Sequence, residues 1–255
     1  MAEILQVTDL RKTYGKRGAV THALDGVSLK LEAGEFVGVM GPSGSGKTTL
    51  LNCVSTIDAP TSGSIVIDGR ELTRLRGRDL ARFRRERLGF IFQDCNLLDT
   101  LTAFENIALA LSIVKAPPSE IKARVEETAA LLGISDCLNK YPYQMSGGQQ
   151  QRCAAARAIV THPALVLADE PTGALDSKSS KLLLERLEVL NREMGATILM
   201  VTHDAFTASC CRRVVFLRDG KLFLELQRGG MDRRAFFAQI IKVVTQLGGE
   251  MEDVL

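Results

Sequence analysis

Apolar and polar residues follow strand-like patterns in the first and last thirds of the chain. Strict alternation predicts half-buried strands at Glu3–Thr8 and Val27–Leu31. Continuous apolar runs predict strands covered on both faces at Phe36–Met40, Leu165–Asp169 and Thr197–Val201. Shorter strands are expected at Ile65–Ile67, Leu88–Phe92, Val214–Leu217 and Leu222–Leu226, the last two joined by an Asp219-Gly220 turn.

The middle of the chain, residues 94–160, has the spacing and end signals of helices instead. A T-x-x-E capping box at Thr102 and Glu105 predicts a helix to about Val114, which Pro117-Pro118 ends. Further helices are expected at Ser119–Gly133 and Ser146–Ile159, and outside the middle segment at Lys47–Val54, Ser177–Met194 and Met231–Leu247. The whole pattern predicts an α/β domain into which a helical segment is inserted.

Length and composition are those of a globular protein with a substantial core. The 255 residues suffice for one large domain or two small ones, and 45% of them are hydrophobic and 24% charged. Lys and Arg number 32 against 30 Asp and Glu, so the chain lacks the basic excess of a protein whose main partner is nucleic acid. The six cysteines include no C-x-x-C pair, and we expect them to be reduced core or surface residues.

No apolar run in the sequence is long enough for a membrane span. The richest run, Ile107–Val114, contains a serine and is far shorter than the roughly 20 residues that a spanning helix needs. The N-terminal residues Met1–Gln6 lack the basic start and apolar core of a signal peptide. We therefore expect an intracellular protein.

A glycine-rich loop follows one buried strand and precedes a predicted helix. It matches the G-x-x-x-x-G-K-[ST] phosphate loop with Gly41, Pro42, Ser43, Gly44, Ser45, Gly46, Lys47 and Thr48, and Thr49 follows. Glycines let backbone N–H groups point at the β- and γ-phosphates, and the helix start adds partial positive charge. Lys47 would supply a charge to the phosphates and Thr48 a hydroxyl to Mg²⁺. A merely flexible Gly/Ser loop is the alternative, and the strand–loop–helix context argues strongly against it.

Two carboxylates end the buried strand Leu165–Asp169. Asp169 fits the strand-end aspartate that holds Mg²⁺, usually through water, in phosphate-loop enzymes. Glu170 is then free to polarise the attacking water. Two adjacent carboxylates at a buried strand end would be costly without a cation. The pair therefore predicts nucleotide hydrolysis, with Asp169 at the metal and Glu170 as the catalytic base.

Further motifs occur in a fixed order around these two sites. Gln93 and His203 each follow a predicted strand, and the segment Met145–Arg152 reads MSGGQQQR. With Tyr14 and Ala174-Leu175-Asp176, this ordered set resembles the nucleotide-binding subunit of ATP-binding-cassette (ABC) transporters over nearly the whole chain. Ser146 also fits a plain S-x-x-Q capping box, and both interpretations can hold at once.

The resemblance implies a fold: a phosphate-loop ABC-ATPase core with an antiparallel β subdomain and an inserted α-helical subdomain. The chain would be a single nucleotide-binding domain, residues 1–255. Within it, residues 1–93 and 161–255 would form the α/β core with the β subdomain, and residues 94–160 the helical signature subdomain.

The resemblance also implies roles for individual residues around ATP and Mg²⁺. The catalytic residues would be Lys47, Glu170 and His203, and the metal ligands Thr48, Gln93 and Asp169. Implied contacts are Tyr14 stacking on adenine, His203 at the γ-phosphate, Gln93 sensing Mg²⁺ and the membrane partner, and Asp176 communicating across a dimer. The signature residues that would complete the ATP site of a second copy are Ser146, Gly147, Gly148 and Gln149.

Within the family, several segments resemble the ATPase of bacitracin-type (Bce-type) antimicrobial-peptide transporters, in the macrolide-export/lipoprotein-release branch. These segments are Ser55–Asp58, Leu88–Thr102, Ala168–Lys178 and Gly229–Phe237. Met145 replaces the usual Leu and Gly173 the usual Ser, and neither change removes a catalytic group. The resemblance implies an ATPase on the cytoplasmic side of the plasma membrane that dimerises on ATP and drives a separate permease in peptide resistance and sensing.

The partners implied are a second copy and a permease docked around Gln93–Glu105, with a sensor histidine kinase reached through the permease as a further candidate and no nucleic acid. One alternative is a sister complex for lipoprotein release, macrolide export or cell division. A purely regulatory role without net transport is another. A non-transport ABC ATPase of DNA repair or translation is more remote, because those relatives carry tandem cassettes or long coiled-coil insertions.

Two weaker patterns remain. An arginine-rich stretch predicts a solvated helix face, with contact to acidic lipid headgroups or an acidic partner as the alternative; it contains Arg74, Arg76, Arg78, Arg82, Arg84, Arg85 and Arg87. An apolar stripe near the C-terminus is expected to pack on the domain itself; it comprises Phe236, Phe237, Ile240, Ile241 and Val244. His22 and His162 match no motif and are interpreted as ordinary residues.

Overall fold

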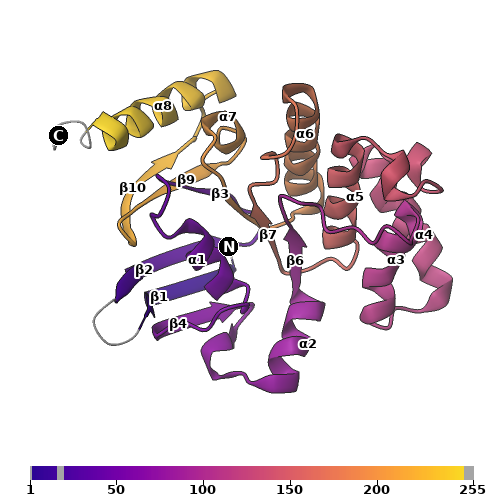
Figure 1. Cartoon of the computed structure of the whole chain (residues 1–255), viewed down its shortest axis with the longest axis horizontal. Helices are drawn as coiled ribbons and strands as arrows, with labels where there is room; N and C mark the ends of the chain where they lie inside the picture. Colours follow the sequence, from indigo (N-terminus) through magenta and orange to yellow (C-terminus); the bar gives the residue numbers. More distant parts are fainter. Residues whose placement is uncertain (1, 16–19, 250–255) are drawn as a thin grey trace.

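The structure is a computed structural model that describes residues 2–15 and 20–249 (Figure 1). Its first elements are β1 (Glu3–Tyr14), β2 (Thr21–Glu32), β3 (Phe36–Met40), α1 (Lys47–Val54), β4 (Ser62–Ile67), β5 (Arg70–Glu71), α2 (Gly77–Arg87) and β6 (Leu88–Ile91). The middle of the chain forms α3 (Ala103–Ile113), α4 (Pro118–Leu132) and α5 (Gly147–Ile159). The last elements are β7 (Leu165–Asp169), α6 (Ser177–Met194), β8 (Ile198–Val201), α7 (Ala205–Ala208), β9 (Arg213–Arg218), β10 (Lys221–Gln227) and α8 (Arg233–Gly249).

Two sheets organise these elements. A four-stranded antiparallel sheet has the order β2-β1-β4-β5, and a six-stranded sheet has the order β10-β9-β3-β8-β7-β6. In the larger sheet all neighbours are parallel except the β9–β10 hairpin. The carboxyl ends of β3, β7 and β8 therefore lie at the same edge, where ligands of open α/β sheets bind.

Apolar side chains fill two layers, one on each face of the larger sheet. Val37 and Val39 face a cluster shared with the smaller sheet and α1, whereas Phe36 and Met40 face a cluster with α3, α5 and α6. This alternation follows from the two-residue period of a strand, and it explains why β3 is apolar at every position. In Figure 1 the helices α3, α4 and α5 gather at one side of the sheet, away from β1, β2 and β4.

The predicted strands and helices are all present, with differences at their ends. β1 continues to Tyr14 instead of ending at Thr8, because a register shift around Asp9 interrupts the alternation while pairing with β2 continues. The short helix α7 had no periodicity to predict it. The arginine-rich stretch includes α2, in which only Phe83 is buried, as a solvated helix requires.

The prediction for the C-terminal stripe is wrong for two of its residues. Phe236 and Ile240 are fully buried, but Ile241 and Val244 are 40% and 38% exposed. The buried face of α8 continues instead through Val243 and Leu247, which follows from the 3.6-residue period of a helix. Within residues 2–15 and 20–249, no helix combines the length and apolar character that crossing a membrane requires.

Candidate functional site

The glycine-rich loop between β3 and α1 folds in a way that only glycine permits. Gly41 and Gly46 have φ of +152° and +101°. A Cβ at Gly41 would lie 2.1 Å from the Leu217 carbonyl oxygen, and one at Gly46 would lie 2.3 Å from the Ala23 carbonyl oxygen. Gly44 has nothing within 4 Å of such a Cβ. The loop thus packs against backbone carbonyls at Gly41 and Gly46 and is open to solvent at Gly44.

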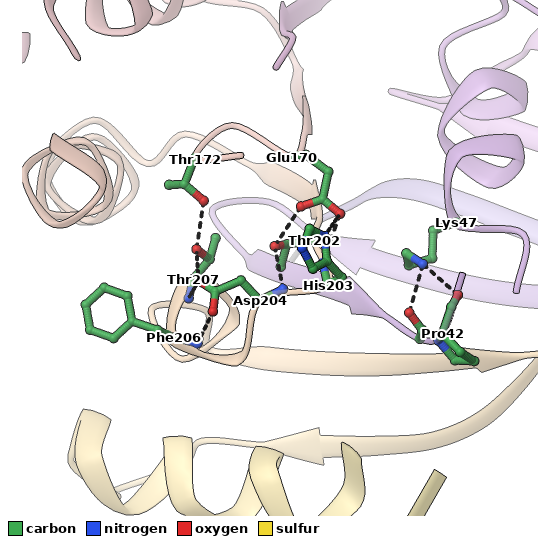
Figure 2. Close-up of polar contacts among 10 residues, drawn as sticks. Pro42, Lys47, Glu170, Thr172, Thr202, His203, Asp204, Phe206 and Thr207 are labelled. Atoms are coloured by element: carbon green, nitrogen blue, oxygen red, sulfur yellow. Dashed lines mark hydrogen bonds and ion pairs between the residues drawn. The ribbon is translucent and has the colours of Figure 1, made fainter. Parts of the chain in front are cut away.

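Lys47, at the first position of α1, closes back over this loop. Its Nζ donates to the carbonyl oxygens of Gly41 and Pro42, both at 2.8 Å (Figure 2). Burial lowers the pKa of Lys47, and the nearby carboxylates of Glu170 and Asp169 oppose that shift. The ammonium group therefore stays next to the concave face of the loop, where a phosphate oxygen could replace the two carbonyls.

A cavity of 630 Å³ opens beside the loop. Glu170 and His203 lie on its wall together with Lys47 and Thr48. Glu170 follows β7 and has φ of +44°, a left-handed conformation that is unusual for a glutamate. Such backbone persists where the surroundings hold it and often marks a functional site.

Two neighbours of β8 hold the Glu170 carboxylate (Figure 2). One oxygen, Oε2, accepts from the Thr202 hydroxyl at 3.0 Å. The other, Oε1, accepts from the His203 backbone N–H at 2.9 Å and lies 2.8 Å from His203 Nδ1. The Glu170 side chain is 17% exposed and that of His203 73%. The hydrogen bonds from Thr202 and His203 thus orient the Glu170 carboxylate, while most of the His203 side chain is open to solvent.

Asp169 and Thr48 fit a magnesium ion that is bound together with phosphate. Asp169 ends β7 half-buried, and burial and the adjacent Glu170 raise its pKa. No group of three or more His, Cys, Asp or Glu side chains in the described part of the chain could hold a metal by itself. Mg²⁺ commonly uses one or two protein oxygens, water and substrate phosphates. A carboxylate and a hydroxyl beside a phosphate loop are the donors that this mode of binding needs.

The signature residues lie apart from the phosphate loop. Ser146 caps α5: its hydroxyl accepts from Gln149 N at 3.3 Å, and Gln149 Oε1 accepts from Ser146 N at 2.9 Å. A Cβ at Gly148 would lie 2.6 Å from Ser179 Oγ, so this glycine allows α5 to pack against α6. Ser146 and Gly147 are exposed. None of the residues lining the cavity belongs to the signature segment, 146–149, which the structure describes in full.

Two other expected site residues, Gln93 and Asp176, do not line the cavity. Gln93 is exposed, and a Cβ at Gly173 would lie 3.1 Å from its Cδ. Asp176 caps α6, accepting from Lys178 N, Ser179 N and Ser179 Oγ. These hydrogen bonds lower the pKa of Asp176.

Tyr14 is fixed by the loop that follows α1. Its hydroxyl donates to Asp58 Oδ2 at 2.6 Å, and Lys12 Nζ lies 4.8 Å from its ring centre. Tyr14 does not line the cavity, although β2 residues next to its strand do. Stacking of Tyr14 on adenine therefore stays a prediction.

Sequence reasoning missed several residues of the site. His22, interpreted as an ordinary residue, lines the cavity, as do Phe216 of β9 and Val244 and Leu247 of α8. These residues are far from the loop in the sequence, so no local motif predicts that they lie next to it. Thr202 was also missed, although its place directly before His203 at the end of a buried strand is a usable signal.

Comparison with known proteins gives a consistent result. A sequence model described as ABC transporter matches residues 24–173. The ABC transporter ATP-binding protein YxdL of Bacillus subtilis is 53% identical over 100% of this chain and 98% of its own length. The bacitracin export ATP-binding protein BceA of Halalkalibacterium halodurans is 50% identical over 98% of this chain and 99% of its own.

A solved structure has the same fold. It is described as a dimeric post-hydrolysis state of the ATP-binding cassette MJ0796 bound to ADP and Pi, and a protein of that name comes from Methanocaldococcus jannaschii. It is 39% identical to this chain, covers 89% of it and 100% of the solved chain, and has a TM-score of 0.80.

Proposed function

The chain belongs to the ABC transporter family of ATP-binding proteins, and we propose that it is the ATP-hydrolysing subunit of a transporter whose membrane path lies in a separate permease. The observation that carries the proposal is the Glu170 carboxylate, held by Thr202 and His203 on the wall of the phosphate-loop cavity. A carboxylate oriented in this way, close to a phosphate-binding lysine, is suited to activating water.

In the proposed reaction the residues of the loop bind and orient ATP. Lys47 exchanges the carbonyls of Gly41 and Pro42 for phosphate oxygens, and backbone N–H groups of the loop donate to the same phosphates. Glu170 accepts a proton from the attacking water at Oε1, while the hydrogen bond from Thr202 keeps Oε2 in place. His203 would donate its ring N–H to the γ-phosphate in place of the contact between its Nδ1 and Glu170.

We further propose that Thr48 and Asp169 hold the magnesium ion, with Gln93 joining them. When bound, Mg²⁺ neutralises charge on the β- and γ-phosphates. Asp169 is desolvated at the end of β7 and next to Glu170, so a cation there relieves the unfavourable ionisation that its raised pKa reports. The residues present therefore fit the ion.

The second half of each ATP site comes, in this proposal, from a second copy of the chain. Ser146, Gly147 and the N-terminus of α5 form an exposed anion-binding end that faces no phosphate loop within its own chain. Two chains arranged head to tail bring the α5 end of one to the loop of the other, and Asp176 would lie near the contact. The dimeric cassette among the solved relatives supports this arrangement.

The permease would dock around Gln93–Glu105, between the core (residues 1–93 and 161–255) and the helical subdomain (residues 94–160). Leu98 in this segment is an apolar side chain that is 46% exposed, and a partner could cover it. The protein would then be peripheral, on the cytoplasmic side of the plasma membrane.

The similarity to a bacitracin export ATP-binding protein supports a role in resistance to and sensing of bacitracin-like peptides. A sensor histidine kinase would be reached through the permease. This role predicts that cells lacking the chain become sensitive to bacitracin. It also predicts that the wild-type chain restores resistance and the Glu170→Gln variant does not. Equal sensitivity of deleted and wild-type cells would exclude this substrate class.

Purification of the tagged chain from native membranes tests the permease. We expect an integral membrane protein to copurify with the wild-type chain and to be lost with Leu98→Glu. Ile57→Glu is the matched control, because Ile57 is 54% exposed but lies after α1, outside the docking segment. Copurification that withstands Leu98→Glu and fails with Ile57→Glu would place the docking surface elsewhere.

A further inference from the structure

The segment between β6 and α3 contains two adjacent left-handed residues that are not glycine. Cys95 and Asn96 have φ of +50° and +48°. Asparagine tolerates this conformation, whereas cysteine rarely adopts it. Such backbone persists only where neighbouring groups determine it. The contacts around these two residues therefore identify what holds the segment.

Those contacts come from one helix, α5. Arg157 Nη1 donates to the Asn96 carbonyl oxygen at 2.5 Å, and its Nη2 donates to the Cys95 carbonyl oxygen at 2.8 Å. Gln151 Nε2 donates to the Phe92 carbonyl oxygen at 2.8 Å, and Gln151 Oε1 accepts from the Cys95 thiol at 2.6 Å. Three backbone carbonyls within five residues are thus fixed by two side chains of α5.

The hydrogen bonds that Gln151 and Arg157 donate from their side chains all go to segment 92–96 among the described residues. Gln151 is fully buried. Arg157 forms no ion pair with any Asp or Glu of residues 2–15 and 20–249, and burial lowers its pKa. A desolvated guanidinium is normally paired with a carboxylate. Here carbonyl dipoles take that place, so its favourable interactions depend on the left-handed turn.

Two residues with proposed functions adjoin these contacts: Ser146 at the start of α5 and Gln93 in segment 92–96. Ser146 caps the first turn of α5. Gln93 lies inside the fixed segment, and its side chain meets Gly173 in the loop between Glu170 and α6. Coupling between sites passes through packed side chains and rigid elements of this kind.

We propose that Gln151 and Arg157 are positioning residues that latch segment 92–96 to α5, so that Gln93 and Ser146 move as one body. The proposal rests on the proposed function, in which the same segment contacts the permease. A permease that displaces residues 93–105 then moves Ser146 relative to the ATP site of the second copy. The latch is the physical connection between docking and hydrolysis.

Cys95 gives a direct readout of the latch. It is half-buried, while Cys53, Cys137, Cys153, Cys210 and Cys211 are buried. Its thiol donates to Gln151 Oε1 and its side chain is partly covered, so it should react slowly with N-ethylmaleimide. Arg157→Lys keeps the charge but loses the paired hydrogen bonds to the Cys95 and Asn96 carbonyl oxygens. It should raise the rate of Cys95 modification about fivefold or more, and peptide mass spectrometry measures that rate.

The matched control is Arg124→Lys. Arg124, on α4, also donates to one backbone carbonyl: its Nη2 lies 2.7 Å from the carbonyl oxygen of Val160, which caps the C-terminal end of α5. None of the hydrogen bonds or ion pairs of Arg124 in the described part of the chain involves residues 92–96. We expect no change in Cys95 modification with this variant. An unchanged rate in Arg157→Lys, or an equal rise in both variants, overturns the latch.

A second variant tests whether Arg157 acts by holding left-handed backbone. Asn96→Gly favours positive φ without help, so Arg157→Lys with Asn96→Gly should return Cys95 modification most of the way to the wild-type rate. A double variant that reacts as fast as Arg157→Lys alone contradicts the mechanism.

Steady-state ATP hydrolysis then separates positioning from stability. Arg157→Lys should lower kcat about threefold or more with the KM for ATP unchanged, at a temperature where melting curves show the protein folded. A lower melting temperature with unchanged kcat would show a merely structural role and overturn the coupling. A wild-type chain that hydrolyses no ATP would refute the proposed function, while Cys95 modification would still decide the latch.

Discussion

The two regions of the molecule proposed to bind phosphate differ in how complete they are. The phosphate-loop half, defined by Gly41–Thr48, Asp169, Glu170 and His203, is internally bonded: Lys47 and Glu170 each have two or more partners in the same chain. The signature half, defined by Ser146–Gln149, begins with two exposed residues, Ser146 and Gly147, and the side chain of Ser146 is hydrogen-bonded only within the first turn of α5. In the proposed function, the first region lacks only its ligand, whereas the second also needs a partner chain. This difference is the one expected of two halves of an ATP site that lie on different chains.

The largest expected effect is on hydrolysis in the phosphate-loop half. Glu170→Gln keeps the shape and the hydrogen bonds to Thr202 and His203 but cannot accept a proton from water. We expect Mg²⁺-dependent ATP hydrolysis to fall at least ~100-fold, with ATP-stabilised dimers persisting in light scattering. Turnover within about threefold of wild type would remove Glu170 from the catalytic role.

The next effect distinguishes a helix cap from an ATP-binding residue in the signature half. Ser146→Ala and Thr102→Ala each remove the serine or threonine of a capping box, at α5 and α3, and each should cost about 1 kcal/mol of stability. Only Ser146→Ala should also lower ATP hydrolysis of the isolated protein, by about tenfold, because it removes a donor to the phosphates of a second copy.

Thr102→Ala serves as the control for stability in that pair, since no permease is present in the isolated protein. Equal losses of activity in the two variants would mean that Ser146 acts only as a cap.

A smaller effect is expected at Gly173, which lies beside Gln93 in the loop between Glu170 and α6. Gly173→Ser places a Cβ about 3 Å from the Gln93 side chain, which must shift by a few tenths of an ångström. We expect a two- to threefold higher Mg²⁺ requirement for hydrolysis, measured by titration. Gly44→Ser adds a side chain to the open face of the loop and is not an equivalent control. Gly230→Ser is suitable, since a Cβ there meets nothing within 4 Å.

The smallest effect concerns the support of Tyr14. Lys12 and Tyr14 hydrogen bonds hold the pKa of Asp58 below its ordinary value of 3.8 in spite of partial burial. A lowered pKa stabilises the fold above pH 3.8 and loses that contribution as pH falls through the folded value. Asp58→Asn should lower the melting temperature at pH 7 by about 1–2 °C. The gap to wild type should close below about pH 4, and a gap that widens in acid would contradict the assignment.

The phosphate-loop half was predictable from sequence because its chemistry is local. Glycines at Gly41 and Gly46, the lysine after them and the carboxylates after an apolar strand all follow from short-range rules, and the structure places Lys47, Asp169 and Glu170 together. The apolar runs of β3, β7 and β8 predicted strands covered on both faces, and the structure places these strands side by side in the larger sheet.

Residues that act through tertiary contacts were out of reach. His22, Val244 and Leu247 meet the cavity only because β2 and α8 converge on the loop. Arg157 was an unremarked residue of a predicted helix, and the left-handed turn that it holds has no sequence signal at Cys95. Ile241 and Val244 could not be assigned correctly for the same reason. Periodicity predicts which side of α8 is apolar, but it does not predict how much of that side the rest of the protein covers.

The claim that each ATP site is shared by two chains is tested most directly by a cross-link between differently tagged copies. One copy carries Ser43→Cys on the phosphate loop and the other Ser146→Cys at the signature, both in a Glu170→Gln background. With ATP and Mg²⁺ we expect a disulfide that joins the two tags and is absent without nucleotide or when only one of the two introduced cysteines is present. ATP-dependent dimers that form without any Ser43→Cys to Ser146→Cys disulfide would contradict the account.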